Sequence, residues 1–139
     1  KKEQSNSIFA VNETVSQWQH VVASYNEETG LVSVWVDGDI GSSQPASDDL
    51  AKIENTAPLL IGKDSLVGYY FNGKIDSIRI SSTDRYSVPF DPEIHLESDT
   101  ATIALWTFSE GAGGTAYDSS GNGHHGTIQG AAWSDDCPH

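Results

Sequence analysis

The chain has 139 residues, 37% of them apolar, and its twenty acidic against seven basic side chains give a formal net charge of −13. This length suits one ordinary domain, and four Trp, five Tyr and four Phe can close a core. A nucleic-acid-binding surface needs clustered positive charge, and no apolar run is long enough to cross a bilayer. We therefore expect neither nucleic-acid binding nor membrane insertion.

The first third of the chain predicts strands. Residues 7–11 are short and apolar, and residues 18–25 and 31–38 are rich in β-branched and aromatic side chains. The intervening residues 26–30 end in Gly and predict a hairpin loop, and Asp37 followed by Gly38 predicts a tight turn. Residues 31–38 are apolar on both faces, which is typical of a central strand.

The rest of the chain continues the strand-and-turn pattern. Residues 41–58 are polar and predict a surface loop, as do residues 83–100 and the glycine-rich 110–126. Further strands are predicted at 59–62, 69–81, 102–109 and 127–133. We find no convincing amphipathic helix, so the fold class is all-β, an antiparallel two-sheet β-sandwich.

Three stretches stand in a distinctive order: WQHVVASYNEETGLVSVWVDG, LLIGK and FNGKIDSIRIS. Together they resemble the second half of a laminin-G-like domain, which is a concanavalin A-like jelly roll of bacterial extracellular proteins. On this resemblance, residues 1–100 form the C-terminal part of such a jelly roll. The resemblance also implies a secreted or cell-surface location in a bacterium.

The segment TIALWTFSEGAGGTAYDSSGNGHHGTIQGAAW resembles the opening strands of the same kind of module, although here it closes the chain. Residues 101–139 are therefore expected to pack into the same sandwich. A full jelly roll is longer than this chain, which leaves three explanations. The sandwich is truncated, it is compact or permuted, or a partner chain or second copy supplies the missing strands by strand addition. We favour the compact or permuted form.

Asp76 is a candidate metal ligand. In a strand it shares a face with Ile78 and Ile80, at the edge of a core, where a carboxylate needs a partner. Pairing with Lys74 or Arg79, or exposure at the strand end, would satisfy it. The resemblance instead implies a structural calcium ion bound by this aspartate.

The stretch DSSGNG is a second candidate calcium position. Asp118 and Asn122 offer side-chain oxygens, and Gly121 leaves its backbone carbonyl free to turn inward. Composition alone favours an Asx-type turn that caps its own backbone. The resemblance favours calcium, with Asp118 and Asp76 as the principal ligands. This sequence departs from the related sequences at Ser109, because they often carry an acidic residue immediately before the Glu-Gly pair.

Other metals and catalysis are not expected. His124 and His125 are adjacent, so in an extended chain they point in opposite directions and chelate poorly. Glucanases of this fold place two Glu on either side of an Asp on one strand. In this chain, Lys74 and Arg79 stand near the positions where those carboxylates would be needed. No other catalytic motif is present. The lone Cys137 has no partner within the chain, so it is free or pairs outside it.

Several aromatic side chains are candidates for ligand stacking, namely Tyr69, Tyr70 and Trp35, whereas Trp18 and Trp106 are assigned to the core. We therefore expect a non-catalytic, calcium-stabilised extracellular module for adhesion to, or binding of, a glycan or a protein. One alternative is an assembly subunit that exchanges strands to form an oligomer or filament. The other is an accessory module of a secreted glycoside hydrolase.

Overall fold

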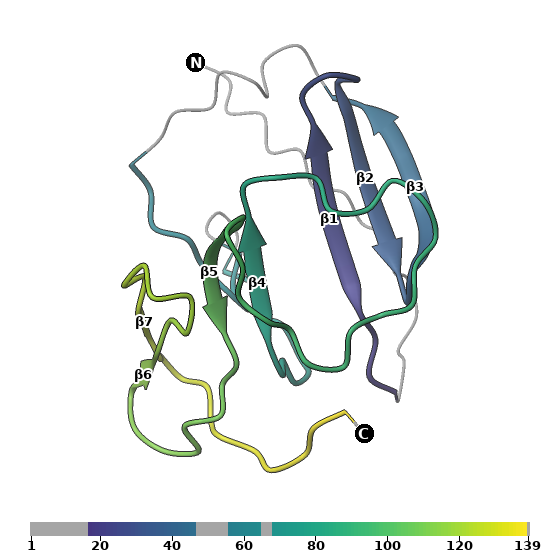
Figure 1. Cartoon of the computed structure of the whole chain (residues 1–139). Coiled ribbons are helices and arrows are strands. Elements are labelled where there is room, and N and C mark those ends of the chain that lie inside the picture. Colours follow the sequence, from purple (N-terminus) through teal and green to yellow (C-terminus); the bar gives the residue numbers. More distant parts are fainter. Residues whose placement is uncertain (1–16, 47–55, 65–67, 139) are drawn as a thin grey trace.

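The computed structural model describes residues 17–46, 56–64 and 68–138, and Figure 1 shows their path. These residues form seven strands and no helix, and each paired set of strands is antiparallel. The strands are β1 (Val21–Asn26), β2 (Leu31–Val36), β3 (Asp39–Pro45), β4 (Ile78–Ser81), β5 (Thr102–Trp106), β6 (Thr115–Ala116) and β7 (Gly126–Thr127). The all-β, antiparallel fold class is confirmed. Within the described ranges, no helix has the length and apolar character that crossing a membrane requires. The apolar stretch 7–11 lies outside the described residues.

The first sheet has the order β1-β2-β3, and its two turns were predicted correctly. Gly30 has a φ of 68° and donates its N–H to the carbonyl of Asn26 at 2.8 Å, which closes the first hairpin loop. Asp37 and Gly38 both have positive φ, 51° and 86°, and form a two-residue loop between β2 and β3. Such turns match the twist of a hairpin.

The prediction of a loop over residues 41–58 was wrong at its start. The turn at Asp37 and Gly38 returns the chain along β2, and residues up to Pro45 pair with it as β3. The hydroxyls of Ser33 and Ser43 lie 3.0 Å apart across the two strands. An edge strand tolerates polar side chains and a terminal proline, because one of its sides needs no ladder partner.

The central strand β2 is covered on both faces, as the sequence predicted. Val34 and Trp35 are consecutive, and both are buried although neighbouring strand residues point to opposite faces. The ring of Phe90, from the loop between β4 and β5, lies 6.0 Å from the Trp35 ring, and Tyr86 stacks on Phe90 at 3.6 Å. This loop crosses the face of the first sheet (Figure 1).

A close backbone approach fixes the same loop to the β2–β3 turn. The N–H of Phe90 donates to the carbonyl of Gly38 at 3.1 Å. A Cβ atom on Gly38 would lie 1.8 Å from the carbonyl oxygen of Phe90, so only glycine fits. Phe90 is therefore the point at which the β4–β5 loop is anchored.

The second sheet is shorter than predicted. β4 pairs with β5, but the strand expected over residues 69–81 is regular only from Ile78, and residues 59–62 form no strand. Within the described ranges, an isolated bridge between Lys63 and Tyr70 is the pairing made by this part of the chain. A strand needs a neighbour to complete its ladder, and residues 72–77 pair with no strand among the described residues.

The main apolar core lies between β4, β5 and the β6–β7 hairpin. Ala104, Trp106 and Ala116 are buried there. The side chains packed around them are Ile78, Ile80, Phe108 and Ile128. The C-terminal third of the chain thus shares its core with β4.

Candidate functional site

Three consecutive aromatic rings project from the surface at Tyr69, Tyr70 and Phe71, which we call the aromatic triplet. Their side chains are 75%, 71% and 60% exposed. Two backbone hydrogen bonds, from Asp64 N to Tyr69 O and from Phe71 N to Gly62 O, each 2.9 Å, join the backbone of the triplet to residues 62–64. The rings are thus presented outward from an ordered backbone.

The surroundings of the aromatic triplet suit a binding surface. The ammonium group of Lys63 lies 5.6 Å from the centre of the Tyr70 ring, within cation–π range. Further apolar side chains are exposed before and after the triplet in the sequence, at Leu59, Leu60, Ile61 and Ile75. A run of exposed apolar side chains rimmed by polar groups is a common mark of an interaction site.

Trp35 does not belong to such a surface, which corrects the prediction that its ring offers a stacking face. It is 3% exposed and packs against Phe90, as described above. The reason is tertiary, because the covering loop comes from residues far along the sequence. Trp106 is buried, as predicted.

Asp118 is the centre of a hydrogen-bonded turn. Its carboxylate is 7% exposed, and Oδ1 accepts the N–H of Leu105 at 3.0 Å and that of Ser120 at 2.9 Å. Oδ2 accepts the Ser120 hydroxyl at 2.8 Å and the N–H of His124 at 3.0 Å. Burial raises the pKa of Asp118, but these hydrogen bonds outweigh it and hold the pKa well below its usual range. The carboxylate is therefore charged and satisfied by protein donors.

The other residues of the turn fasten it to β5. The side-chain amide of Asn122 donates to the carbonyls of Thr102, at 3.1 Å, and Ile103, at 2.9 Å. Gly121 is exposed with a φ of 88°, a conformation that glycine adopts readily. The turn thus has the Asx-type geometry that its composition indicates, and it joins β5 to the β6–β7 hairpin.

Asp76 lies on a separate segment, two residues before β4, and is half-buried. Among the described residues it makes no hydrogen bond or ion pair, and its predicted partners are engaged elsewhere. Lys74 pairs with Asp136, and Arg79 pairs with Glu93. No group of three or more His, Cys, Asp or Glu in the described ranges is arranged to hold a metal ion. Calcium binding stays a prediction.

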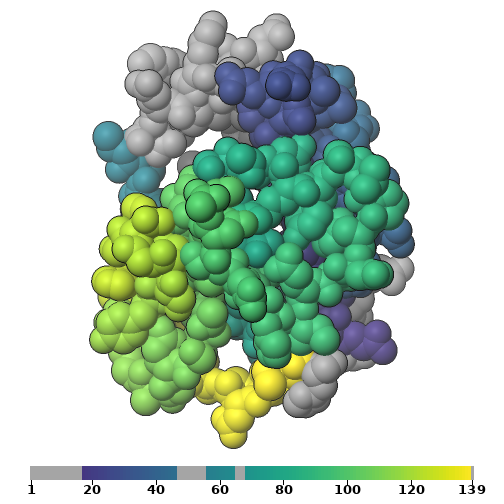
Figure 2. All heavy atoms as spheres, viewed as in Figure 1, coloured from purple at the N-terminus to yellow at the C-terminus, as the bar shows by residue number. Residues whose placement is uncertain are grey.

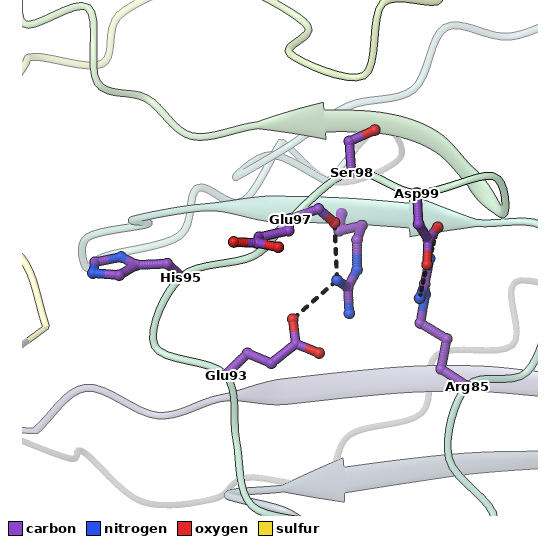
Figure 3. Close-up of a pocket in the computed structure, with 7 residues that line it drawn as sticks. Arg85, Glu93, His95, Glu97, Ser98 and Asp99 are labelled. Carbon is purple, nitrogen blue, oxygen red and sulfur yellow. Dashed lines mark hydrogen bonds and ion pairs between the residues drawn. The ribbon is translucent and has the colours of Figure 1, made fainter.

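A polar hollow of about 330 Å³ lies beneath the β4–β5 loop, and the sequence analysis did not foresee it. Figure 3 labels six of its residues, all of them in the loop between β4 and β5. The lining consists of Arg79, Arg85, Glu93, His95, Glu97, Ser98 and Asp99.

Each arginine of the hollow is neutralised by the protein itself. Nη1 of Arg79 donates to Glu93 Oε2 at 3.0 Å and to the carbonyl of Glu97 at 3.1 Å, while Nη2 donates to Tyr86 Oη at 3.2 Å. The Arg79 side chain is only 7% exposed. A buried guanidinium needs such partners, so Arg79 ties the loop to β4.

Arg85 and Asp99 form the second pair, with two parallel hydrogen bonds of 2.7 and 2.8 Å. The hydrogen bond from Arg85, followed by that from the Thr102 hydroxyl, holds the pKa of Asp99 well below its usual range. Asp99 in turn raises the pKa of Arg85. The ion pairs of the hollow thus position the loop. In the sequence, the arginines and acidic residues that alternate over residues 79–99 were the pattern from which these ion pairs could have been predicted.

These observations define an all-β, antiparallel architecture with an exposed aromatic surface. A family model described as the concanavalin A-like lectin/glucanases superfamily matches residues 3–87, which is 85 of the 139 residues, and the chain belongs to this family. No match was found among curated proteins or among solved structures. The family match ends in the loop after β4, so β5, β6 and β7 follow it.

Proposed function

We propose that this chain is a non-catalytic binding module of a secreted or cell-surface protein, and that its ligand is a glycan. The observation that carries the proposal is the exposure of the aromatic triplet on a backbone that is hydrogen-bonded to residues 62–64. Sugar rings have apolar C–H faces that stack on aromatic rings, and the hydroxyls of Tyr69 and Tyr70 can hydrogen-bond to sugar hydroxyls. Membership of a family of lectins and glucanases supports this class of ligand.

The charge distribution around Asp76 supports a binding role without hydrolysis. Glycoside hydrolysis needs two carboxyl groups on either side of the scissile bond, separated by roughly 5–10 Å. In the segment of residues 74–80, Asp76 is the one acid, and the flanking Lys74 and Arg79 are cations that pair with Asp136 and Glu93. This segment therefore offers no second carboxyl group with which Asp76 could form a hydrolytic pair.

Calcium is expected to stabilise the module at Asp76. A half-buried carboxylate is costly unless it is paired, hydrogen-bonded or bound to a cation, and no described residue pairs with it. Calcium accepts carboxylate and backbone carbonyl oxygens in flexible geometry. Asp118, by contrast, already accepts four hydrogen bonds and would have to exchange them for the ion.

A glycan array followed by titration calorimetry with the selected glycan tests this proposal. We expect selective, saturable binding that Tyr69→Ala and Tyr70→Ala weaken at least tenfold, since each ring contributes about 1–2 kcal/mol of stacking and packing. Tyr117→Ala is the matched control, because Tyr117 is also exposed but lies next to His125 at the C-terminal turn. Absence of selective glycan binding would reject a glycan ligand, and binding that survives both substitutions would reject the aromatic triplet as the site.

A further inference from the structure

The C-terminal segment, residues 101–133, is internally cross-linked and is called here the C-terminal unit. Trp106 Nε1 donates to the carbonyl of His124 at 2.9 Å, and Trp133 Nε1 donates to that of Gly113 at 3.0 Å. The Asp118 turn adds bonds back to β5, and Figure 2 shows the yellow-green residues gathered on one side of the molecule. The unit therefore has contacts that would hold it together if it moved.

Among the described residues, the unit meets residues 17–46, 56–64 and 68–90 chiefly through one strand pair. Ile78 pairs with Trp106, and Ile80 pairs with Ala104, across the β4–β5 ladder. Next to this ladder, Ser82 N donates to Ala101 O at 2.9 Å. The Arg85–Asp99 ion pair closes the same end of the interface.

The connection between the two parts has the properties of a hinge. Upstream, Phe90 is anchored to Gly38, and downstream, Asp99 is anchored to Arg85. Between them, residues 91–98 are mostly exposed, and the polar hollow lies beneath them rather than a packed core (Figure 3). Among the described residues, this stretch makes polar contacts with Arg79 through the Glu93 carboxylate and the Glu97 carbonyl, and the Glu93 side chain is itself exposed to solvent.

We infer that the C-terminal unit exchanges between two copies of this chain, so that β5 of one copy pairs with β4 of the other. In such a dimer the β4–β5 register, the shared core and the Arg85–Asp99 pair all form again. The hinge changes conformation, and the contacts of Arg79 with Glu93 and Glu97 have to be rearranged with it. The family match ends before β5. The strand that pairs with β4 therefore lies outside the matched residues, and the long β4–β5 loop connects the two. Exchange of identical elements is a low-cost route to a dimer.

The balance between monomer and dimer follows from concentration. The hinge holds the unit near its own β4 at an effective concentration of the order of 1 mM, as is usual for short tethers. Protein refolded at about 1 μM should close on itself, whereas protein refolded near 1 mM should exchange. The exchange does not depend on whether the aromatic triplet binds a glycan.

Cross-linking between copies tests the exchange directly. Ser82→Cys and Ala101→Cys are prepared as separate full-length variants, each with Cys137→Ser, and are unfolded, mixed and refolded under oxidising conditions. Residues 82 and 101 lie next to each other just beyond the end of the strand pair, where a backbone hydrogen bond joins them. A disulfide-linked heterodimer is therefore expected when the strand pair joins two copies. We expect this heterodimer after refolding near 1 mM and at least a tenfold smaller share after refolding near 1 μM.

A matched control and the unmodified chain make the result decisive. Thr29→Cys, on an exposed loop residue of β1–β2, replaces Ala101→Cys in a parallel mixture and should give no heterodimer above background. Equal heterodimer yields in the two mixtures, or none in either, would overturn the proposal. Native mass spectrometry of isotopically labelled and unlabelled wild-type chains, refolded together near 1 mM, should show mixed dimers, and a purely monomeric spectrum would also overturn it.

Discussion

Arg85 and Asp99 join the two ends of the β4–β5 loop through paired hydrogen bonds of 2.7 and 2.8 Å. Asp99 also accepts the N–H of Ala101 and the hydroxyl of Thr102, so it starts β5 at a fixed position beside the end of β4. A planar guanidinium and a carboxylate make this geometry specific. The pair therefore acts as the latch of the C-terminal unit.

Removing the latch should loosen β5 more than it destabilises the whole fold. In Asp99→Asn the paired acceptor is lost, and we expect a small fall in melting temperature together with faster amide hydrogen exchange at Ala104, which pairs with Ile80 in the β4–β5 ladder. The carboxylate is exposed, so solvent screening limits its contribution to global stability. Glu93→Gln, at the other arginine pair, is the control. Equal exchange rates at β5 in wild type and Asp99→Asn would contradict the assignment of a latch.

Substitution of Asp118 should have a much larger effect. Asp118→Ala leaves the backbone N–H groups of Leu105, Ser120 and His124 without their acceptor, and a buried unpaired group costs about 1–3 kcal/mol. We expect unfolding free energy to fall by about 3 kcal/mol in total, measured by urea denaturation. Asp135→Ala, at an exposed position in the C-terminal tail, should leave stability within about 0.5 kcal/mol of wild type.

Acid should act through the same carboxylate. The pKa of Asp118 is lowered in the folded state, so its contribution to stability is complete above the unfolded pKa of about 3.9 and is lost as the pH falls through the lower folded value. Urea midpoints measured between about pH 5 and pH 2 should decline more steeply for wild type than for Asp118→Ala. Parallel curves would show that Asp118 is not the group responsible.

His20 should produce a pH dependence in a higher range. Burial lowers the pKa of His20, and Glu93 only partly opposes this effect, while the ring lies against Phe90 at 5.6 Å. The unfolded chain then takes up the proton first, so stability should decrease as the pH falls below about 6.5. Wild type should lose more stability between pH 8 and pH 5 than His20→Gln, with His95→Gln as the exposed control. An identical loss in His20→Gln would contradict this prediction.

Calcium should raise the melting temperature if Asp76 binds it. A native-state ligand adds about 2.7 kcal/mol of stability at a hundredfold excess over its dissociation constant. Melting curves with calcium and with excess chelator should differ for wild type and coincide for Asp76→Ala, whereas Asp91→Ala, at an exposed loop position, should keep the difference. Coincident wild-type curves, with no calcium in the protein by elemental analysis, would contradict the prediction.

Local pattern was sufficient for β1, β2 and the turns beside them, because β-branched runs and the Asp37–Gly38 pair encode short-range geometry. It failed at β3, where polar residues 39–45 become a strand only because β2 offers a ladder partner. The local pattern also failed at Leu59, Leu60 and Ile61. Their apolar side chains predicted a buried strand, but these residues are exposed. Burial depends on what lies opposite, and a local pattern does not contain that information.

The sequence by itself determined the all-β class, the family and the exposure of at least one ring in the Tyr69–Tyr70 pair, since these follow from composition, alternation and residue order. Only the tertiary structure decided that Trp35 is covered by Phe90, that Arg79 and Arg85 meet Glu93 and Asp99, and that β5 completes β4. These contacts join residues far apart in the chain. They form because the packing of two distant segments lowers the free energy jointly, and neither segment specifies its partner alone.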